Sequence, residues 1–596
     1  MKLRKILAVV LALALLCTTL AACGNDAGSG TSSGSASSGS ASSGSASSGA
    51  DAGDTATGTS GGTLNLRSTM EPTSLNSLLA TYAYDFTPMQ AMIECLYRKD
   101  ENDVPQPAAA ETIDVSDDGL TYTFHLREDA VWSNGDPVVA TDFEFAWKQA
   151  LNPKVAAAYG YILYMLENAE AYFNYESYVM DPDAWVEANP DKEVPAEVTW
   201  EDVGVKVIDE YTLEAKLVNP LPYAGDLFAF PIMCPINEKF YNEVGADKYA
   251  TEVEYFCTNG IYNITGWEHN SSITFEKRED YWNAEAIGPD KVVYKIIPDS
   301  QAGLNSYLSR EIDYTDLDSG ETVLQAENAG FEVGVKPSRS SYYLLANVND
   351  PYLSNQNLRL ALAYSVDRQA LIDAVYQNDN QPMTSFVPPA TMGANGSSFQ
   401  EALLAEKGEM YPAAADLDKA KEYLDAALSE LGCTVDQITL SIDCSDDALR
   451  RNCATFLQEQ WRQNLGIENI AVNSKQAAQV SADRNAGNYC MSLGGWSPDY
   501  NDSMTFLDLW LTGGGNNDTG WSSEEYDSLI AQAIAEPDEE ARQQMLFQCE
   551  EILAEEMPII PLYWQCQNYS YNTDKIVDGA RITANQTTFW YATLAE

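Results

Sequence analysis

The chain has 596 residues, well above the roughly 250–300 at which a single hydrophobic core stops growing, so at least two lobes are expected. It carries 34 Lys and Arg against 89 Asp and Glu, a net charge of −55. This balance excludes the basic surface that nucleic acids and anionic lipids require of a partner. The 12 Trp, 34 Tyr and 17 Phe suffice for a large core with aromatic surface left over.

The start of the chain reads as an export signal. A basic stretch at residues 2–5 precedes an apolar run at 6–16, which is too short to be a permanent membrane span. The sequence Leu20-Ala-Ala-Cys23-Gly that follows resembles a bacterial lipobox. We therefore predict a signal peptide at 1–22, cleavage before Cys23 and acylation of its thiol. The alternative is a conventional signal peptide with an unrelated cysteine.

Residues 23–62 are nearly all Ser, Gly and Ala, and this composition predicts a flexible linker rather than a packed core. Of the 11 cysteines, Cys17 leaves with the signal and Cys23 takes the lipid, so 11 − 2 = 9 remain. An odd number cannot pair completely. We expect most of the nine to be small buried residues, and leave an occasional disulfide open.

The ordered part begins with strand patterns and continues with alternating helices and strands. Before residue 340, strands are predicted at 63–67 and 120–127, and two more between 203 and 217. Beyond it, helices are predicted at 356–375, 417–431, 447–465, 523–535 and 538–556. Strands are predicted between them at 437–442, 467–473, 488–493 and 558–563. Such alternation indicates an α/β lobe.

The turn at residues 494–500 is the strongest candidate for a binding site. Two glycines allow a backbone to come close to a ligand, and the aromatic side chains supply flat walls. No Lys or Arg occurs at 485–541 to neutralise the single carboxylate of the turn, which predicts a seat for a small cation such as an amino terminus. The plain alternative is a strand, turn and helix with an exposed Asp. The candidate residues are Gly495, Trp496, Asp499 and Tyr500.

Five stretches, taken in order, carry a resemblance to a known family. They are Asp118–Arg127, Trp132–Phe143, Thr258–Tyr262, Asn357–Arg368 and Gly495–Asn501. Together they resemble the family 5 extracellular solute-binding proteins, the oligopeptide- and dipeptide-binding lipoproteins of bacterial ABC importers. The resemblance implies a periplasmic-binding-protein-like α/β fold, three-lobed, with two main lobes joined by a hinge and a smaller inserted lobe. The main lobes of such proteins close on the ligand by hinge motion.

The resemblance also implies how the chain divides among the lobes. Lobe I is expected in three pieces, at 63–98, 201–336 and 565–596. Lobe II is expected at 99–200 and lobe III at 337–564.

The resemblance assigns roles to single residues. In peptide-binding members, the Asp matching Asp499 pairs with the α-amino group of the ligand. Main-chain hydrogen bonds hold the rest of the peptide in a strand-like pose, so many sequences are accepted. Trp496 would line a pocket for a side chain of the peptide. Tyr159 matches a tyrosine that contacts the ligand in some members.

The sequence departs from the pattern of the family at two positions, so it does not predict the length of the ligand. Some members place an Arg, three residues before the Trp, against the ligand's carboxylate; here that position is Leu493. The Glu that such members carry near the start of lobe I corresponds to Thr81. Arg450 or Arg451, on a predicted helix, could meet a carboxylate instead.

Nothing in the sequence points to catalysis. The two histidines, His125 and His269, do not have the spacing of metal ligands. We expect no catalytic residue, metal or cofactor. With 89 acids in the chain, a catalytic pair of carboxylates remains an alternative. The first prediction is an extracytoplasmic, lipid-anchored and monomeric receptor for small peptides. It would serve the permease and ATPase subunits of an ABC importer and meet the membrane only through its lipid. The alternatives are a receptor for oligosaccharides or another small solute and, less favoured, a secreted hydrolase.

Overall fold

The structure is a computed structural model that describes residues 61–190, 192–584 and 586–595. The predicted signal peptide at 1–22, the predicted lipidation site Cys23 and nearly all of the predicted linker lie outside the described residues. Within the described residues, no helix is both long and apolar enough to cross a membrane.

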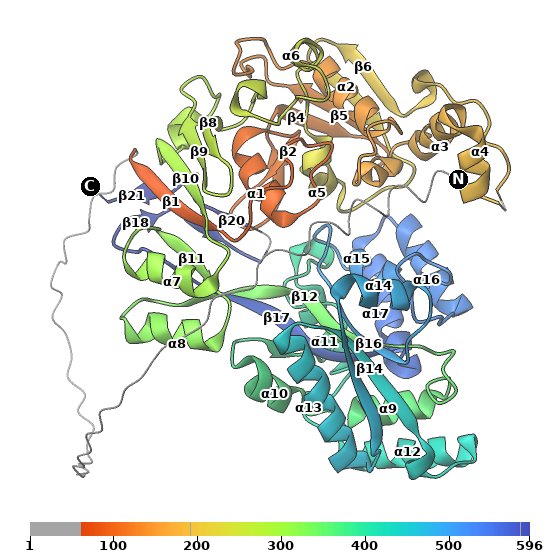
Figure 1. Cartoon of the computed structure of the whole chain (residues 1–596). Helices are drawn as coiled ribbons and strands as arrows, with labels where there is room; N and C mark the ends of the chain where they lie inside the picture. Colours follow the sequence, from red (N-terminus) through yellow and green to blue (C-terminus); the bar gives the residue numbers. More distant parts are fainter. Residues whose placement is uncertain (1–60, 191, 585, 596) are drawn as a thin grey trace, which may run out of the picture. The chain divides into compact units, whose positions relative to one another are not determined.

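One sheet of 11 strands contains residues from the start, the middle and the end of the described chain (Figure 1). Its first half consists of β1 (Thr63–Ser68), β8 (Tyr262–Glu268), β9 (Ser272–Lys277), β10 (Lys291–Ile296) and β11 (Tyr314–Leu317). Its second half consists of β14 (Thr439–Ser445), β15 (Asn469–Lys475) and β16 (Met491–Trp496). Between them lie β12 (Gly334–Ala346) and β17 (Ile559–Tyr571), with the short β13 (Gln381–Pro382) beside β17. The strand order is β15-β14-β16-β12-β17-β11-β1-β10-β9-β8.

The two 13-residue strands β12 and β17 connect the halves of this sheet. They pair with each other in antiparallel register, with a break between Lys336 and Ser340. At one end β17 pairs with β11, through residues 568–571, and at the other end β12 pairs with β16, through residues 341–346. Two long strands shared by both halves are the connection across which the halves can move relative to each other.

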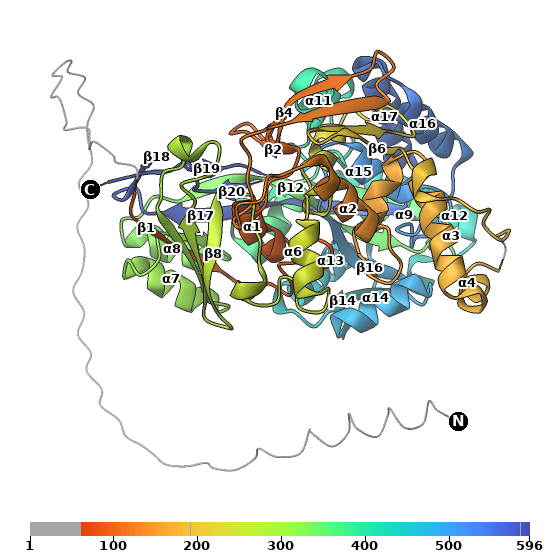
Figure 2. The same cartoon turned by 90° about the horizontal axis from the view of Figure 1, so that it is seen from above.

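The second half of the sheet has the parallel strands expected of an α/β lobe. β14 pairs in parallel with β15 and with β16. The crossovers are α13 (Ala448–Leu465) and α14 (Ala477–Asn485), as parallel neighbours require. The other helices here are α9 (Gln356–Tyr364), α10 (Arg368–Leu371), α11 (Phe399–Lys407), α12 (Leu417–Leu431), α15 (Met504–Leu507), α16 (Glu524–Ala535) and α17 (Glu539–Glu556). The last two pack side by side (Figures 1 and 2).

Most of the predicted helices agree with the structure to within one residue, and one does not. The helix predicted at 417–431 is α12, which ends at Gly432 in the left-handed region (φ 64°), a conformation that glycine adopts without strain. The helix predicted at 356–375 is broken instead. Asp367 accepts a hydrogen bond from the backbone of Ala370 and so starts α10, while the buried Arg368 donates to the carbonyl oxygen of Pro561. The local cap at Asp367 and the long-range contact of Arg368 together outweigh the continuous helical pattern.

A separate four-stranded sheet has the order β4-β5-β7-β6. Its strands are β4 (Ala110–Val115), β5 (Thr121–Leu126), β6 (Val205–Asp209) and β7 (Thr212–Lys216), accompanied by α2 (Ala140–Ala150), α3 (Ala169–Met180), α4 (Pro182–Ala188), α5 (Ala224–Phe228) and α6 (Glu238–Val244). In β5 the alternate residues Tyr122, Phe124 and Leu126 are buried, as a half-buried strand requires. Because β7 pairs with β5, the predicted end of lobe II at residue 200 cuts through this sheet.

The remaining elements follow β1, flank β11 or lie at the end of the chain. α1 (Ala83–Met92) and the pair β2 (Tyr97–Lys99) and β3 (Pro105–Pro107) follow β1, and α7 (Ser300–Leu308) and α8 (Gly320–Asn328) flank β11. At the end of the chain β18 (Ile576–Asp578) pairs with β21 (Thr593–Leu594), and β19 (Arg581–Ile582) with β20 (Thr587–Thr588). A disulfide joins Cys95 to Cys234, and five of the seven other described cysteines are buried.

Candidate functional site

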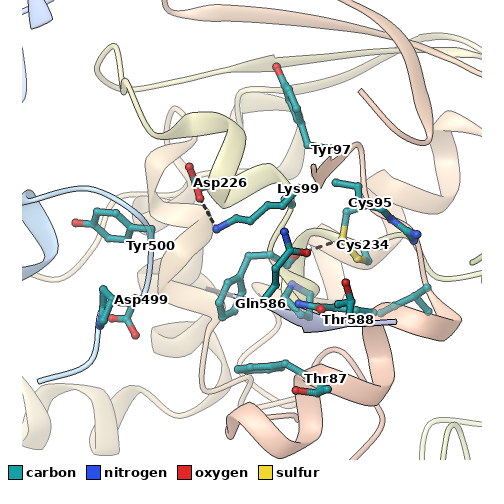
Figure 3. A pocket seen from close by; sticks show the side chains of 18 of the residues that line it. Thr87, Cys95, Tyr97, Lys99, Asp226, Cys234, Asp499, Tyr500, Gln586 and Thr588 are labelled. Carbon is teal, nitrogen blue, oxygen red and sulfur yellow. Dashed lines mark hydrogen bonds and ion pairs between the residues drawn. A yellow bond between two sulfur atoms is a disulfide. The ribbon is translucent and has the colours of Figure 1, made fainter. Parts of the chain in front are cut away.

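A cavity of about 420 Å³ brings together four stretches that are far apart in sequence. Its volume is in the range of sites for small ligands, about 300–1,000 Å³. The stretches are residues 81–99, 226–234, 497–500 and 581–591, joined by Tyr159 and Arg339. Figure 3 shows part of this lining, with Asp499 and Tyr500 on one side and the disulfide on the other.

Asp499, predicted to bind the ligand, lines the cavity and is half-buried. The hydroxyl of Tyr161 donates a hydrogen bond to its carboxylate at 3.4 Å. Burial raises the pKa of Asp499 above its ordinary value, and the Tyr161 hydrogen bond and the nearby Arg339 only partly oppose this. A carboxylate that has lost part of its hydration gains from an arriving cation.

Tyr500 also lines the cavity, and its ring lies in a stack. It packs on Tyr223 with ring centroids 4.3 Å apart and planes 11° from parallel. Close by, burial and the neighbouring Asp499 and Asp502 raise the pKa of Asp508 to about 7. Asp499 therefore has further acids close behind it in the protein.

The turn that carries Asp499 is fixed by an ion pair just behind it. Arg542 donates to Asp502 from both terminal nitrogens, at 2.9 and 2.6 Å, and both side chains are buried. Such two-pronged pairs combine strength with a fixed geometry. α17 thus holds the position of the segment that faces the cavity.

Tyr159 lies in the cavity wall, where the resemblance places a ligand contact. Its ring packs edge-on against Phe86 at 5.6 Å and lies 5.0 Å from the ring of Phe230. Both phenylalanines also line the cavity, so the three rings form an apolar face of the lining. Thr81, at the position where some family members carry Glu, lines the cavity as well.

Three of the predicted site residues lie elsewhere. Gly495, Trp496 and Arg450 are not among the described residues that line this cavity. A Cβ on Gly495 would come within 2.5 Å of the Tyr342 ring, so this glycine makes room for a side chain of the protein itself. The indole nitrogen of Trp496 donates to Thr505 Oγ1 at 3.4 Å.

Arg450 is also engaged within the protein. Its guanidinium carbon lies 4.4 Å from the centre of the Tyr342 ring, in a cation–π contact. Leu493, at the position where some members carry a carboxylate-binding Arg, is buried in β16. The structure therefore brings neither residue to the cavity.

Several lining residues carry no local signal in the sequence. Arg98 and Lys99 come from β2, and Asp226 from α5, where Lys99 Nζ lies 2.6 Å from Asp226 Oδ1 (Figure 3). The Cys95–Cys234 disulfide is part of the same wall and links two segments 139 residues apart. Long-range contacts such as this disulfide and ion pair bring these residues together, so sequence patterns could not identify them.

A second cavity of about 450 Å³ adjoins the first. The two share lining residues, namely Thr87, Gln90, Arg339, Ser497 and Gln586. The rest of its lining comes from β1 and the loop after it, α1, β9, β10, β11, β12, β17 and the C-terminal segment. A ligand that fills the first cavity therefore has room to continue toward β12 and β17, the strands that connect the two halves of the large sheet.

The described residues contain no group of three or more His, Cys, Asp and Glu arranged to hold a metal ion. His125 Nε2 lies 3.1 Å from Asp114, and His269 Nδ1 lies 2.6 Å from Glu71. Neither histidine belongs to the described lining of the two cavities.

Comparisons with known proteins agree with this geometry. The model of the bacterial extracellular solute-binding proteins, family 5 Middle, matches residues 104–518. The oligopeptide-binding protein OppA of Bacillus subtilis (strain 168) is 33% identical over 511 residues, which cover 84% of this chain and 87% of the relative. The dipeptide-binding protein DppE of the same strain is 32% identical over 505 residues, with 84% and 86% covered.

Solved structures show the same likeness. The peptide-bound OppA of Listeria monocytogenes matches with a TM-score of 0.68 and 28% identity, over 90% of this chain and 99% of that one. The substrate-binding domain of an oligopeptide ABC transporter from Bacillus anthracis matches with a TM-score of 0.68, 30% identity and the same coverage. The chain belongs to the bacterial extracellular solute-binding proteins of family 5, which are binding receptors and not enzymes, and it has their periplasmic-binding-protein-like α/β fold.

Proposed function

We propose that this protein captures peptides outside the cytoplasm and delivers them to an ABC importer. The relatives named above are oligopeptide- and dipeptide-binding proteins, and one solved neighbour was crystallised with peptide. The observation that carries the proposal for this chain is the position of Asp499, a half-buried carboxylate in the wall of a ligand-sized cavity.

The α-amino group of the peptide binds the carboxylate of Asp499. An ammonium brings the positive charge that stabilises a partly buried carboxylate. It can also donate hydrogen bonds to the acceptor positions of Asp499 that the Tyr161 hydroxyl does not occupy. The stacked Tyr500 and the ring of Tyr159 flank the cavity and offer apolar surface to the first side chains of the peptide.

Closure around the ligand is the second part of the proposal. Asp499 and Tyr500 follow β16 in the second half of the large sheet, whereas the lining residues at 81–99 follow β1 in its first half. Tyr161 and Tyr223, from the part of the chain that forms the four-stranded sheet, also contact Asp499 and Tyr500. A peptide held between these parts adds contacts that exist only in the closed arrangement. Such differential contacts are what a ligand needs to shift the equilibrium toward closure.

The remaining features of the proposal concern location and partners. A lipid on Cys23 and the linker that follows would tether the receptor to the outer face of the cell membrane. A permease and ATPase of the importer would then receive the peptide from a monomeric receptor. Palmitate labelling of the wild-type protein and of Cys23→Ser tests the anchor, and labelling that persists in the variant contradicts it.

Isothermal titration calorimetry with tri-alanine, N-acetyl-tri-alanine and cellotriose tests the binding function. We expect tri-alanine to bind and acetylation to weaken binding, because acetylation removes the ammonium that Asp499 receives. Binding of cellotriose with no binding of tri-alanine would instead identify an oligosaccharide receptor, and equal binding of the two alanine peptides would contradict the role of Asp499.

A further inference from the structure

The wall of the first cavity carries positive charge that amine recognition does not use. In a chain of net charge −55, its described lining holds four cationic side chains against two carboxylates. The cations are Arg98, Lys99, Arg339 and Arg581, and the carboxylates are Asp226 and Asp499. Two of these cations also have an anionic partner outside the lining, Arg98 at Glu94 and Arg581 at Glu101, whereas Lys99 has its ion pair with Asp226 inside it.

Two of these cations, Arg98 and Lys99, are neighbours on β2 and are called the β2 cations below. Lys99 lies 2.6 Å from Asp226 Oδ1, yet this oxygen has no hydrogen-bond partner of acceptable geometry among the described residues. The contact is therefore ionic but poorly aligned. An ammonium has three donors, and a quarter of the Lys99 side chain is exposed, so it can accept a second anionic partner.

Arg98 also has a hydrogen-bonding group without a partner of its own among the described residues. Its Nη2 lies 3.4 Å from Glu94 Oε1, whereas its buried Nη1 has no acceptor within the described part of the chain. An unsatisfied buried donor costs about 1–3 kcal/mol, more when it is charged. A ligand oxygen within reach of Nη1 would remove this cost while the other end of the guanidinium stays beside Glu94.

We propose that the β2 cations bind a carboxylate of the ligand, an inference that rests on the proposed peptide-binding function. Figure 3 shows Lys99 between Asp226 and the Cys95–Cys234 disulfide, with Asp499 on the opposite side of the cavity from the disulfide. A peptide whose ammonium sits at Asp499 can extend along the cavity toward β2. The carboxylate is either the C-terminus of a short peptide or an acidic side chain.

This assignment gives the receptor a preference that the turn at 497–500 alone cannot give. Arg and Lys pair strongly with carboxylates, through charge-assisted hydrogen bonds. A C-terminus reaches β2 only at one peptide length, because each residue of an extended chain adds about 3.3–3.6 Å. Longer peptides continue into the second cavity and lose this contact.

The test uses calorimetry on the full-length protein with alanine peptides of two to five residues, each as free acid and as C-terminal amide. A second series consists of the amides with one Ala replaced by Glu. We expect the free acid to bind at least about tenfold more tightly than the amide at one length, or the Glu-containing amide to recover that affinity if the side chain is the source.

Two variants locate the effect. Lys99→Met/Asp226→Asn removes the ion pair as a unit, and Arg98→Gln leaves Glu94 with its hydrogen bonds from Tyr281 and Trp282. Both should reduce the preference for a carboxylate severalfold while keeping the affinity for the alanine amides, which also shows that the fold is intact.

Arg127→Gln is the matched control, because Arg127 stacks on Trp282 at 3.6 Å beside the same glutamate but lies outside the described lining of the cavity. It should leave the preference unchanged. Equal affinity for acids, amides and Glu-containing amides overturns the inference, and so does a preference that survives both β2 variants. Failure of every peptide to bind overturns the proposed function instead, and the inference with it.

Discussion

Two carboxylates of one turn, three residues apart, have opposite surroundings. Asp502 is buried, receives both terminal nitrogens of Arg542 and accepts a hydrogen bond from the backbone of Met504 at 2.8 Å. Asp499 is half-buried in the cavity wall, and the hydroxyl of Tyr161 at 3.4 Å is its only side-chain hydrogen bond within the described residues. A carboxylate with a fixed cation stabilises the fold, whereas one without a fixed cation is available to a ligand.

The largest effect on stability should come from breaking the fixed pair. Asp502→Asn leaves the guanidinium of Arg542 buried without its counter-ion, which should lower the free energy of unfolding by about 3–5 kcal/mol. Urea denaturation followed by tryptophan fluorescence measures this. The double variant Asp502→Asn/Arg542→Gln should lose clearly less, since no charge is left unpaired. An equal loss in both would show that the charge pair is not what the turn depends on.

The largest effect on binding should come from the other carboxylate. Asp499→Asn removes the charge that receives the peptide ammonium and should weaken binding of a free-amine peptide by about 2–5 kcal/mol, with little loss of stability. Calorimetry on tri-alanine measures this, and N-acetyl-tri-alanine is the control whose affinity should hardly change. A variant that binds tri-alanine like the wild type removes Asp499 from the site.

A third kind of carboxylate is buried and has no ion pair with any of the residues that the structure describes. Glu550 accepts the backbone N–H groups of Phe386 and Val387, yet burial raises its pKa from 4.5 to about 7. The unfolded chain loses this proton near its lower pKa, so the fold loses stability as pH rises from about 4.5 to about 7.

Glu550→Gln should abolish this part of the pH dependence, which is on the order of 3 kcal/mol. Urea midpoints between pH 5 and pH 8 measure it, with Glu555→Gln, on the exposed side of α17, as the control that keeps the wild-type slope. A slope that is unchanged in Glu550→Gln contradicts the assignment.

The smallest effect is expected at Arg450. Its contact with the Tyr342 ring is worth about 0.5–2 kcal/mol. Arg450→Gln should therefore lower stability by roughly 1 kcal/mol and leave peptide affinity unchanged. A loss of affinity for free-acid peptides alone would place Arg450, rather than the β2 cations, at the carboxylate of the ligand.

How much of the site the sequence predicts depends on whether its residues are neighbours in the chain. Asp499 and Tyr500 belong to one turn with Gly and Pro around it, so the pattern points to them directly. Gly495 and Trp496 share that stretch but lie on β16, where the Tyr342 ring and Thr505 engage them.

The other cavity wall could not be predicted in this way. β2 reaches the cavity through the disulfide between Cys95 and Cys234 and the ion pair between Lys99 and Asp226, and neither partner is close in sequence. No periodicity or spacing signals such contacts.

The same distinction holds for the fold. Local caps and a helical period were enough to predict α12, α13, α16 and α17, because both signals lie within the element. The contact of Arg368 with Pro561, beside the break at Asp367, and the pairing of β7 with β5 join residues far apart in the chain, so the local pattern did not show them.

A crystal structure with a bound tripeptide tests the central claim most directly. We expect the α-amino nitrogen of the peptide within about 3.2 Å of a carboxylate oxygen of Asp499, with the peptide extending along the cavity toward β2. A peptide bound with its amino group elsewhere, and the carboxylate of Asp499 turned to solvent, would contradict the account.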